Sequence, residues 1–195
     1  MFNHNRGLWG YTGSAADGEA LTIQSTGMGG PSAAIVIAEL AELGAQRLLR
    51  VGTCGALGGS FELGELLIAS EAIAHDGTSR ALGAAERVPA SPELLRELTL
   101  ASNGATRSGA VVSTDLFYDG AEGSEQRWQQ QGALAVEMET ATLFALAARR
   151  GLQAGAVLIV TDQLIPTRRR IETERLRSAE HRSGELAARA LARDH

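Results

Sequence analysis

The chain has 195 residues, a formal net charge of −5 and a hydrophobic fraction of 44%. This composition is that of a single globular domain with room for a substantial core. The negative net charge argues against a nucleic-acid partner, which would favour a basic surface. One cysteine, Cys54, excludes an internal disulfide and a cysteine-based zinc cluster. The four histidines lack metal-ligand spacing, so we expect no bound metal.

The sequence contains no apolar stretch long enough to span a membrane. The N-terminal residues, MFNHNRGLWGYTG, lack the basic and then apolar layout of a signal peptide. We therefore expect a cytoplasmic protein that does not associate with membranes.

Predicted strands and helices alternate along the chain. Short apolar runs predict strands at 20–25, 47–51, 65–74, 108–113, 133–138 and 155–162. Helical spacing predicts helices at 31–43, 92–103, 139–150 and 172–193, the second with Ser91 as its N-cap. This alternation predicts an α/β fold, with a mixed, largely parallel central sheet flanked by helices, in one domain over residues 1–195.

Four candidate loops, after Ser25, Val51, Ser113 and Val160, each follow the C-terminal end of a predicted strand. Ligands of open α/β sheets bind at that edge. We therefore expect these loops to meet at one site.

The segment GMGGPS, residues 27–32, joins a predicted strand to a predicted helix. It is a near miss to the dinucleotide fingerprint, because Ser32 stands at the third glycine position and no acidic residue follows at the required distance. A tight turn with glycines at positive φ is the simpler interpretation. Such a turn still brings backbone N–H groups to a helix N-terminus, where anions bind.

The segment RVGTCGALGG, residues 50–59, lacks the Gly-Lys-Ser/Thr of a nucleotide P-loop. It places Arg50 at the end of an apolar strand, where burial requires an anionic partner. That partner is either a bound anion or a protein carboxylate, and the motif alone favours neither. Cys54 is interpreted as a packed residue rather than a nucleophile.

Carboxylates stand at two further predicted strand ends. Glu137 and Glu139, two residues apart, share a face in extended backbone and precede a helix N-terminus. They are either ordinary helix-start acids or acceptors for a sugar diol. Asp162 ends the strand 155–162, where it is either a cap or a general acid.

Six segments together resemble the bacterial-type nucleoside phosphorylase family, which holds purine nucleoside, methylthioadenosine and uridine phosphorylases. They follow in the family's order and at close to its spacing over nearly the whole chain: RGLWGYTG, STGMGGPSA, RVGTCGAL, STDLFY, VEMETATLFALA and IVTD. The resemblance implies phosphorolysis of a purine nucleoside to free base and ribose 1-phosphate, with inorganic phosphate as co-substrate and no other cofactor.

The resemblance also implies roles for individual residues. Arg50, Thr53 and Arg6 match phosphate ligands, Arg6 serving a neighbouring subunit. Met28, Met138 and Glu139 match ribose contacts. Asp162 matches the acid that protonates purine N7, and Arg175 matches an arginine that supports this transfer. The residues that match the surroundings of the base are Cys54, Gly55, Phe117, Val136 and Glu137.

The family begins with a strand, a glycine-arginine loop and a helix that precede the position matched by Arg6 here. We therefore expect a chain that is N-terminally truncated relative to the family and lacks two phosphate ligands and a neighbour's histidine. Four alternatives stay open: uridine phosphorylase, methylthioadenosine phosphorylase, nucleoside hydrolase and a truncated non-catalytic homologue. The family's assembly implies a homo-hexamer or homodimer, with nucleoside and phosphate as its small-molecule partners.

Overall fold

The computed structural model describes residues 1–15, 17–58, 60–118 and 121–192, and its centre is a seven-stranded sheet. The strand order is β5-β4-β6-β7-β3-β8-β9. Because β4 also pairs with β8, five of these strands close on themselves into a small barrel. The bounds are β3 (Arg47–Ala56), β4 (Leu66–His75), β5 (Arg87–Pro89), β6 (Arg107–Thr114), β7 (Ala133–Glu137), β8 (Gln153–Gln163) and β9 (Arg169–Arg170).

The sheet is mixed. Its longest ladders, β3 with β8 and β4 with β6, are parallel, as is β6 with β7. The pairings of β3 with β7, β4 with β5, β4 with β8 and β8 with β9 are antiparallel and short. This arrangement confirms the predicted α/β class with a mixed central sheet.

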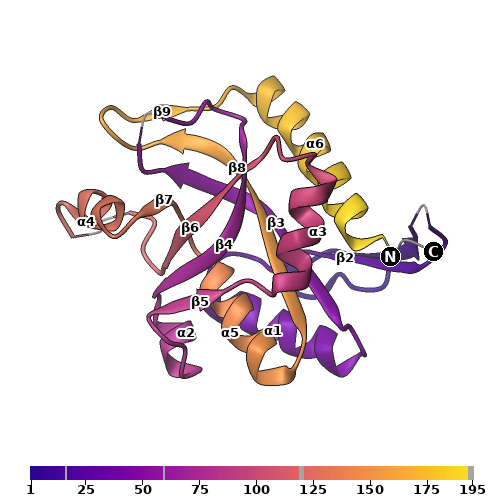
Figure 1. Ribbon diagram of the computed structural model, residues 1–195. Helices are drawn as coiled ribbons and strands as arrows, with labels where there is room; N and C mark the ends of the chain where they lie inside the picture. Colours follow the sequence, from indigo (N-terminus) through magenta and orange to yellow (C-terminus); the bar gives the residue numbers. More distant parts are fainter. Residues whose placement is uncertain (16, 59, 119–120, 193–195) are drawn as a thin grey trace.

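Helices cover both faces of the sheet (Figure 1). The helices α1 (Gly30–Glu42), α2 (Gly77–Ala81) and α5 (Thr140–Arg150) pack together on one face. The helices α3 (Pro92–Ala101) and α6 (Thr173–Leu191) pack together on the other, and α4 (Ser124–Gln130) lies beside β7. The largest core cluster lies between the sheet and α5, and it contains Leu143 and Phe144 of α5 together with Leu67 and Leu158 of the sheet.

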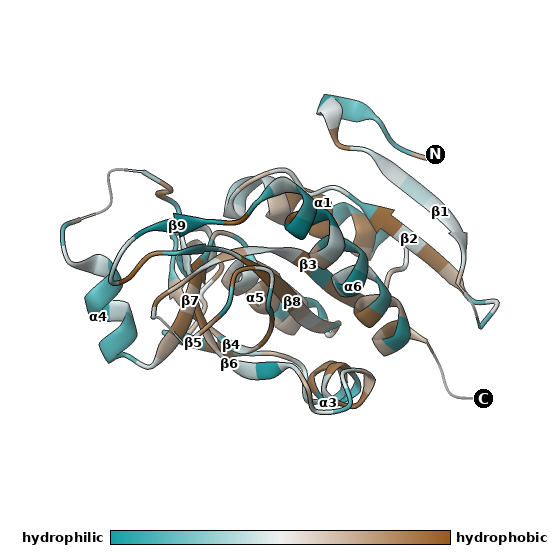
Figure 2. Ribbon diagram, turned by 90° about the horizontal axis from the view of Figure 1, so that it is seen from above, coloured by the Kyte–Doolittle hydropathy of each residue, from teal (hydrophilic) through white to brown (hydrophobic). Residues whose placement is uncertain are grey.

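The N-terminal hairpin lies outside this body. A 3-10 turn (Asn5–Gly7) leads into β1 (Gly10–Ser14), which pairs with β2 (Ala20–Gln24) in a separate two-stranded sheet. Figure 2 shows the hairpin standing apart from the layered elements. The strand predicted at 20–25 is therefore present, but the turn after Ser25 does not extend from the central sheet as expected. β2 pairs instead with its neighbour in sequence, β1. The sequence pattern predicts a strand but does not specify its pairing partner.

β3 is longer than its sequence predicts. The strand was expected to end at Val51, but it continues through the glycine-rich run to Ala56. Pairing with β8 along its whole length, and with β7 at Gly55 and Ala56, overrides the low strand propensity of glycine. Thr53, Cys54 and Gly55 consequently lie on a strand rather than in the expected loop.

Ser91 also differs from its predicted role. Its side chain makes no capping hydrogen bond to α3, and its hydroxyl instead accepts from the Ala154 N–H at 2.7 Å. Ser91 thus connects the start of α3 to β8, which helps to fix the helix against the sheet.

Candidate active site

A cavity of about 1260 Å³ runs along β3 to the C-terminal ends of β3, β7 and β8. It brings together eleven of the residues predicted for the site from segments far apart in the sequence. These are Met28, Arg50, Thr53, Cys54, Gly55, Phe117, Val136, Glu137, Met138, Glu139 and Asp162. The meeting of the candidate residues at one edge of the sheet follows from the parallel pairing of β3 with β8 and of β6 with β7.

Arg50 is held between two carboxylates at the floor of this cavity. Its Nε lies 3.1 Å from Glu137 Oε2, and its Nη2 lies 2.5 Å from Glu139 Oε2. The Arg50 side chain is 15% exposed, and Glu137 is almost fully buried. The protein thus supplies the anionic partner that a buried arginine requires. Among the described residues only these two carboxylates accept from the guanidinium, so its other N–H donors are available to a ligand.

Glu137 anchors this arrangement to α5. Its carboxylate accepts from the N–H groups of Glu139 and Thr140 and from the Ser113 hydroxyl, in addition to Arg50. The helix N-terminus favours a negative charge at this position. Because a carboxylate has about four acceptor positions, these protein contacts leave little capacity for a base. The geometry favours Glu137 as a residue that positions Arg50.

Glu139 connects the GMGG turn to the same cluster. Its Oε1 accepts from the Gly29 N–H at 2.5 Å. Gly29 has φ 83°, a left-handed conformation that glycine adopts without strain. The anion that the turn was expected to bind is therefore, in this structure, a protein carboxylate. Burial raises the pKa of Glu139 above its usual value, although Arg50 and the Gly29 N–H act in the opposite direction.

Gly52 provides the space that the Arg50 side chain occupies. A Cβ at Gly52 would lie 2.7 Å from Cζ and Nη2 of Arg50, closer than real contacts allow. The guanidinium therefore folds back over the backbone of its own strand. This explains why a glycine stands two residues after the arginine.

Asp162 lies near the C-terminal end of β8, beside a β-bulge in the pairing of β8 with β3. The register of β3 and β8 shifts between Cys54 and Gly55, so Gly55 pairs with Asp162. Bulges reorient side chains, and this one brings the carboxylate to the cavity. The Thr161 hydroxyl donates to Asp162 Oδ2 at 3.0 Å, and Arg168 Nη2 lies 3.5 Å from Oδ1.

Cys54 is buried beneath the site. Burial strongly raises the pKa of its thiol, and the nearby Glu137 carboxylate acts in the same direction. A thiol in this environment stays protonated, which agrees with its interpretation as a packed residue rather than a nucleophile.

Arg6 and Arg175 do not line this cavity in the described chain. Arg6 lies exposed in the turn before β1, with φ 55°. Arg175 lies in the first turn of α6, and its side chain packs against the backbone turn at Gly64. Their phosphate-binding and proton-transfer roles stay predictions.

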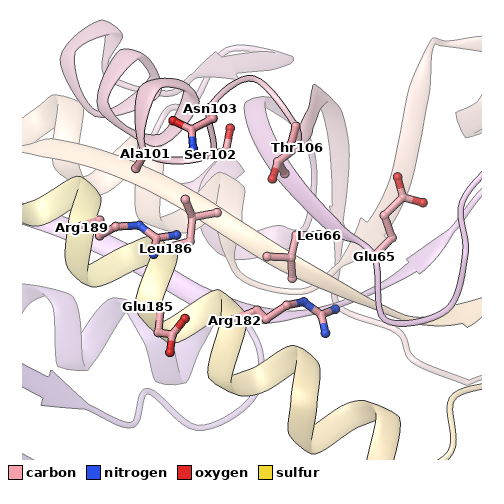
Figure 3. Close-up of a pocket in the computed structure, with 11 residues that line it drawn as sticks. Glu65, Leu66, Ala101, Ser102, Asn103, Thr106, Arg182, Glu185, Leu186 and Arg189 are labelled. Atoms are coloured by element: carbon pink, nitrogen blue, oxygen red, sulfur yellow. The ribbon is translucent and has the colours of Figure 1, made fainter.

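A second, smaller cavity of about 380 Å³ lies between α6 and the connection from α3 to β6. Figure 3 shows Arg182, Glu185 and Arg189 on α6, and Ser102 and Asn103 on the turn after α3. The guanidinium of Arg182 donates a hydrogen bond to the Gly64 carbonyl at 2.6 Å. This cavity lies apart from the Arg50 cluster and contains none of the predicted site residues.

Within the described ranges, no group of three or more histidine, cysteine, aspartate or glutamate side chains is placed to hold a metal ion. None of the helices in the same ranges combines the length and apolar character needed to cross a membrane.

Ser113 and Leu164 were not singled out by sequence, and Arg168 was named only within the arginine run 168–170, interpreted as a solvated face or as the source of a replacement phosphate ligand. Ser113 holds Glu137, Leu164 packs over Gly55, and Arg168 contacts Asp162. Ser113 stands in the STDLFY motif, so its motif position was a usable signal. Leu164 and Arg168 follow Asp162 in a segment without periodicity, and only the pairing of β8 with β9 turns this segment back over the cavity.

The fold and this cluster agree with the comparison to known proteins. The chain matches the Phosphorylase superfamily over residues 1–193 and belongs to that family. It is 43% identical over 154 residues to the guanosine phosphorylase of Halorubrum lacusprofundi, covering 76% of this chain and 64% of the relative. The chain thus spans less than two thirds of that relative's length.

Two further relatives carry different substrates in their names. The chain is 38% identical over 170 residues to the DeoD-type purine nucleoside phosphorylase of Alkaliphilus metalliredigens, covering 84% of this chain and 72% of the relative. It is 36% identical over 173 residues to the uridine phosphorylase of Salmonella typhimurium, covering 77% and 68%. The family is therefore that of nucleoside phosphorylases. The comparisons do not distinguish between a purine nucleoside and uridine as the substrate of this chain.

Proposed function

We propose that this chain catalyses phosphorolysis of purine nucleosides, giving the free base and ribose 1-phosphate. The observation that carries the proposal is the shared cavity of Asp162 and the Arg50–Glu139 pair. A carboxyl group can protonate a leaving base, and a guanidinium can bind an attacking phosphate. The names of the guanosine and purine nucleoside phosphorylase relatives support the same reaction.

The proposed reaction breaks the bond between ribose C1′ and purine N9 and forms a bond between C1′ and a phosphate oxygen. Asp162 donates a proton to N7, so the departing base leaves as a neutral molecule. Glu139 accepts hydrogen bonds from the 2′ and 3′ hydroxyls. Arg50 and Thr53 hold phosphate, whose charge stabilises the cationic character that develops on the sugar.

Purine is preferred over uridine because of Asp162. A purine has a basic N7 whose protonation assists departure, and a pyrimidine has no equivalent atom on its leaving ring. An acid at the end of β8, at the cavity wall, fits the purine chemistry.

The test is base release from inosine, guanosine and uridine, each measured with and without inorganic phosphate. We expect phosphate-dependent release of hypoxanthine and guanine, with ribose 1-phosphate as the second product. Release that is independent of phosphate would make the chain a hydrolase, and faster release of uracil would overturn the purine assignment. Nucleoside binding without any release would favour a non-catalytic homologue.

A further inference from the structure

Arg168 lies at the Asp162 end of the cavity, on the turn between β8 and β9. Its Nη2 is 3.5 Å from Asp162 Oδ1, and its Cζ is 6.0 Å from the centre of the Phe117 ring. All three side chains line the cavity. Arg168 therefore lies near both the proposed proton donor and the aromatic side chain proposed to contact the base.

The guanidinium keeps donors available in this position. Its side chain is 55% exposed, whereas that of Asp162 is 13% exposed. The contact with Asp162 is long and involves one nitrogen of the group. The remaining N–H groups have no acceptor recorded among the described residues, and a guanidinium has no acceptor atom of its own.

The chemistry of the purine determines what this arginine would meet. N7 and the exocyclic group at C6 lie on the same edge of the ring system. If Asp162 donates its proton to N7, the C6 substituent lies next to Asp162, on the side where Arg168 contacts this carboxylate. Guanine and hypoxanthine present an oxygen acceptor there, whereas adenine presents an amino donor.

We propose that Arg168 is a specificity-determining residue that selects 6-oxopurine nucleosides over 6-aminopurine nucleosides by donating hydrogen bonds to O6. The proposal rests on the proposed function, since it assumes that Asp162 faces N7. The amino group of adenosine and the guanidinium of Arg168 are both hydrogen-bond donors, so neither could accept from the other. Each would lose hydrogen bonds to water on burial. Phe117 adds apolar contact that does not distinguish the two bases.

Inosine and adenosine are matched substrates for the test, because they differ in the oxo or amino character of C6. We expect the wild-type protein to prefer inosine, measured as kcat/KM for phosphorolysis. Arg168→Gln is expected to lower kcat/KM for inosine about 10- to 100-fold and to change that for adenosine less than about 3-fold. Arg168→Lys, which retains the charge but loses the planar fork, is expected to recover part of the preference.

Arg169→Gln is the matched control, because Arg169 is the neighbouring exposed arginine on β9 and does not line the cavity. It is expected to leave the substrate ratio unchanged. An equal loss for both substrates in Arg168→Gln would overturn the proposal and make Arg168 a positioning residue for Asp162. A wild-type preference for adenosine, or a loss expressed in the KM for phosphate alone, would also overturn it.

A binding measurement separates this inference from the proposed function. If no nucleoside is cleaved, the proposed reaction fails, but calorimetric titration with hypoxanthine and with adenine still tests Arg168. Tighter binding of hypoxanthine, reduced by Arg168→Gln and not by Arg169→Gln, would support selection of the oxo group. Equal binding of the two bases by the wild-type protein would refute it.

Discussion

At the scale of single residues, the site depends on how the protein distributes its buried charges. Arg50 faces two carboxylates, one of which, Glu137, is saturated by protein donors. The other, Glu139, has the Gly29 N–H and Arg50 as partners and lines the cavity. This division of roles makes Glu137 the group that positions Arg50, and it leaves Glu139 as the carboxylate suited to bind substrate hydroxyls.

Asp162→Asn is expected to lower kcat for inosine by about 10²- to 10⁴-fold with little change in nucleoside binding, because an amide cannot supply the proton. Steady-state kinetics and calorimetric titration with inosine measure the two effects separately. The control substrate is 7-methylguanosine, whose ring already carries the positive charge that protonation would give. We expect the variant to cleave it at close to the wild-type rate, and an equal loss on both substrates would contradict the role of Asp162 as an acid.

Glu139→Gln is expected to lower kcat/KM by about 10- to 100-fold for nucleosides that carry both ribose hydroxyls, because hydrogen bonds to a charged acceptor are lost. A 2′-deoxynucleoside should lose less, since it lacks one of the two hydroxyls. Equal losses for inosine and 2′-deoxyinosine would refute the contact to the 2′ hydroxyl.

Glu139 also predicts a pH dependence. Because its pKa is raised in the folded protein, the group stabilises the fold at acid pH, and this contribution is lost as pH rises through the raised pKa. Substrate binding needs the ionised form, so activity should fall on acidification at a higher pH than an ordinary glutamate would give. The Tm difference between wild type and Glu139→Gln should therefore change with pH, and a difference that stays constant would contradict the raised pKa.

At the scale of elements, β3 combines structural and functional demands in one strand. It pairs with β8 along its length and with β7 at its end, and it carries Arg50, Gly52 and Thr53 into the cavity. The glycines that lower its strand propensity serve close packing. Gly52 accommodates the Arg50 guanidinium, and Gly55 accommodates the Leu164 side chain at the bulge.

Gly52→Ala is expected to displace the Arg50 guanidinium from its two carboxylates and to raise the KM for phosphate about 10- to 100-fold, through the loss of charge-assisted hydrogen bonds. Gly13→Ala is the control, because a Cβ at Gly13 in β1 meets open space. Circular dichroism should show that both variants are folded. An unchanged KM for phosphate in folded Gly52→Ala would contradict the role of Arg50.

At the scale of the whole molecule, the N-terminal region lies outside the layered body. β1 and β2 pair with each other rather than with the central sheet, and Arg6 precedes them, exposed and not lining the cavity of its own chain. Along most of β3, from Arg47 to Cys54, the described strands pair with one of its edges only, and these residues of β3 line the cavity. This arrangement is compatible with an Arg6 that acts outside its own subunit.

We expect a homo-oligomer, either a hexamer built from dimers or a dimer, in which Arg6 reaches the phosphate of a neighbouring subunit. Light scattering at micromolar concentration measures the assembly. Arg6→Ala should keep the oligomer and raise the KM for phosphate. A monomer with full activity would contradict the prediction.

The sequence by itself determined the α/β class and the order of the main elements, because apolar periodicity and turn residues are local signals. The resemblance to the family supplied most of the eleven predicted residues that line the cavity. The sequence determined Arg50, Glu139 and Asp162 as a set through motifs that each follow a strand. Local signals do not specify strand partners, so the separate β1–β2 hairpin and the extension of β3 to Ala56 were decided by tertiary pairing.

The tertiary structure also decided how the charged residues divide their roles. The residue pattern alone does not separate Glu137 from Glu139. Packing against Ser113 and the N-terminus of α5 saturates the carboxylate of Glu137, whereas Glu139 keeps acceptor capacity toward the cavity. The arginine run 168–170 is interpreted from sequence as a solvated face or the source of a replacement phosphate ligand, and no pattern within it sets Arg168 apart. The antiparallel return of β9 against β8 brings it to Asp162, because contacts between side chains of an irregular segment depend on the path of the backbone rather than on spacing.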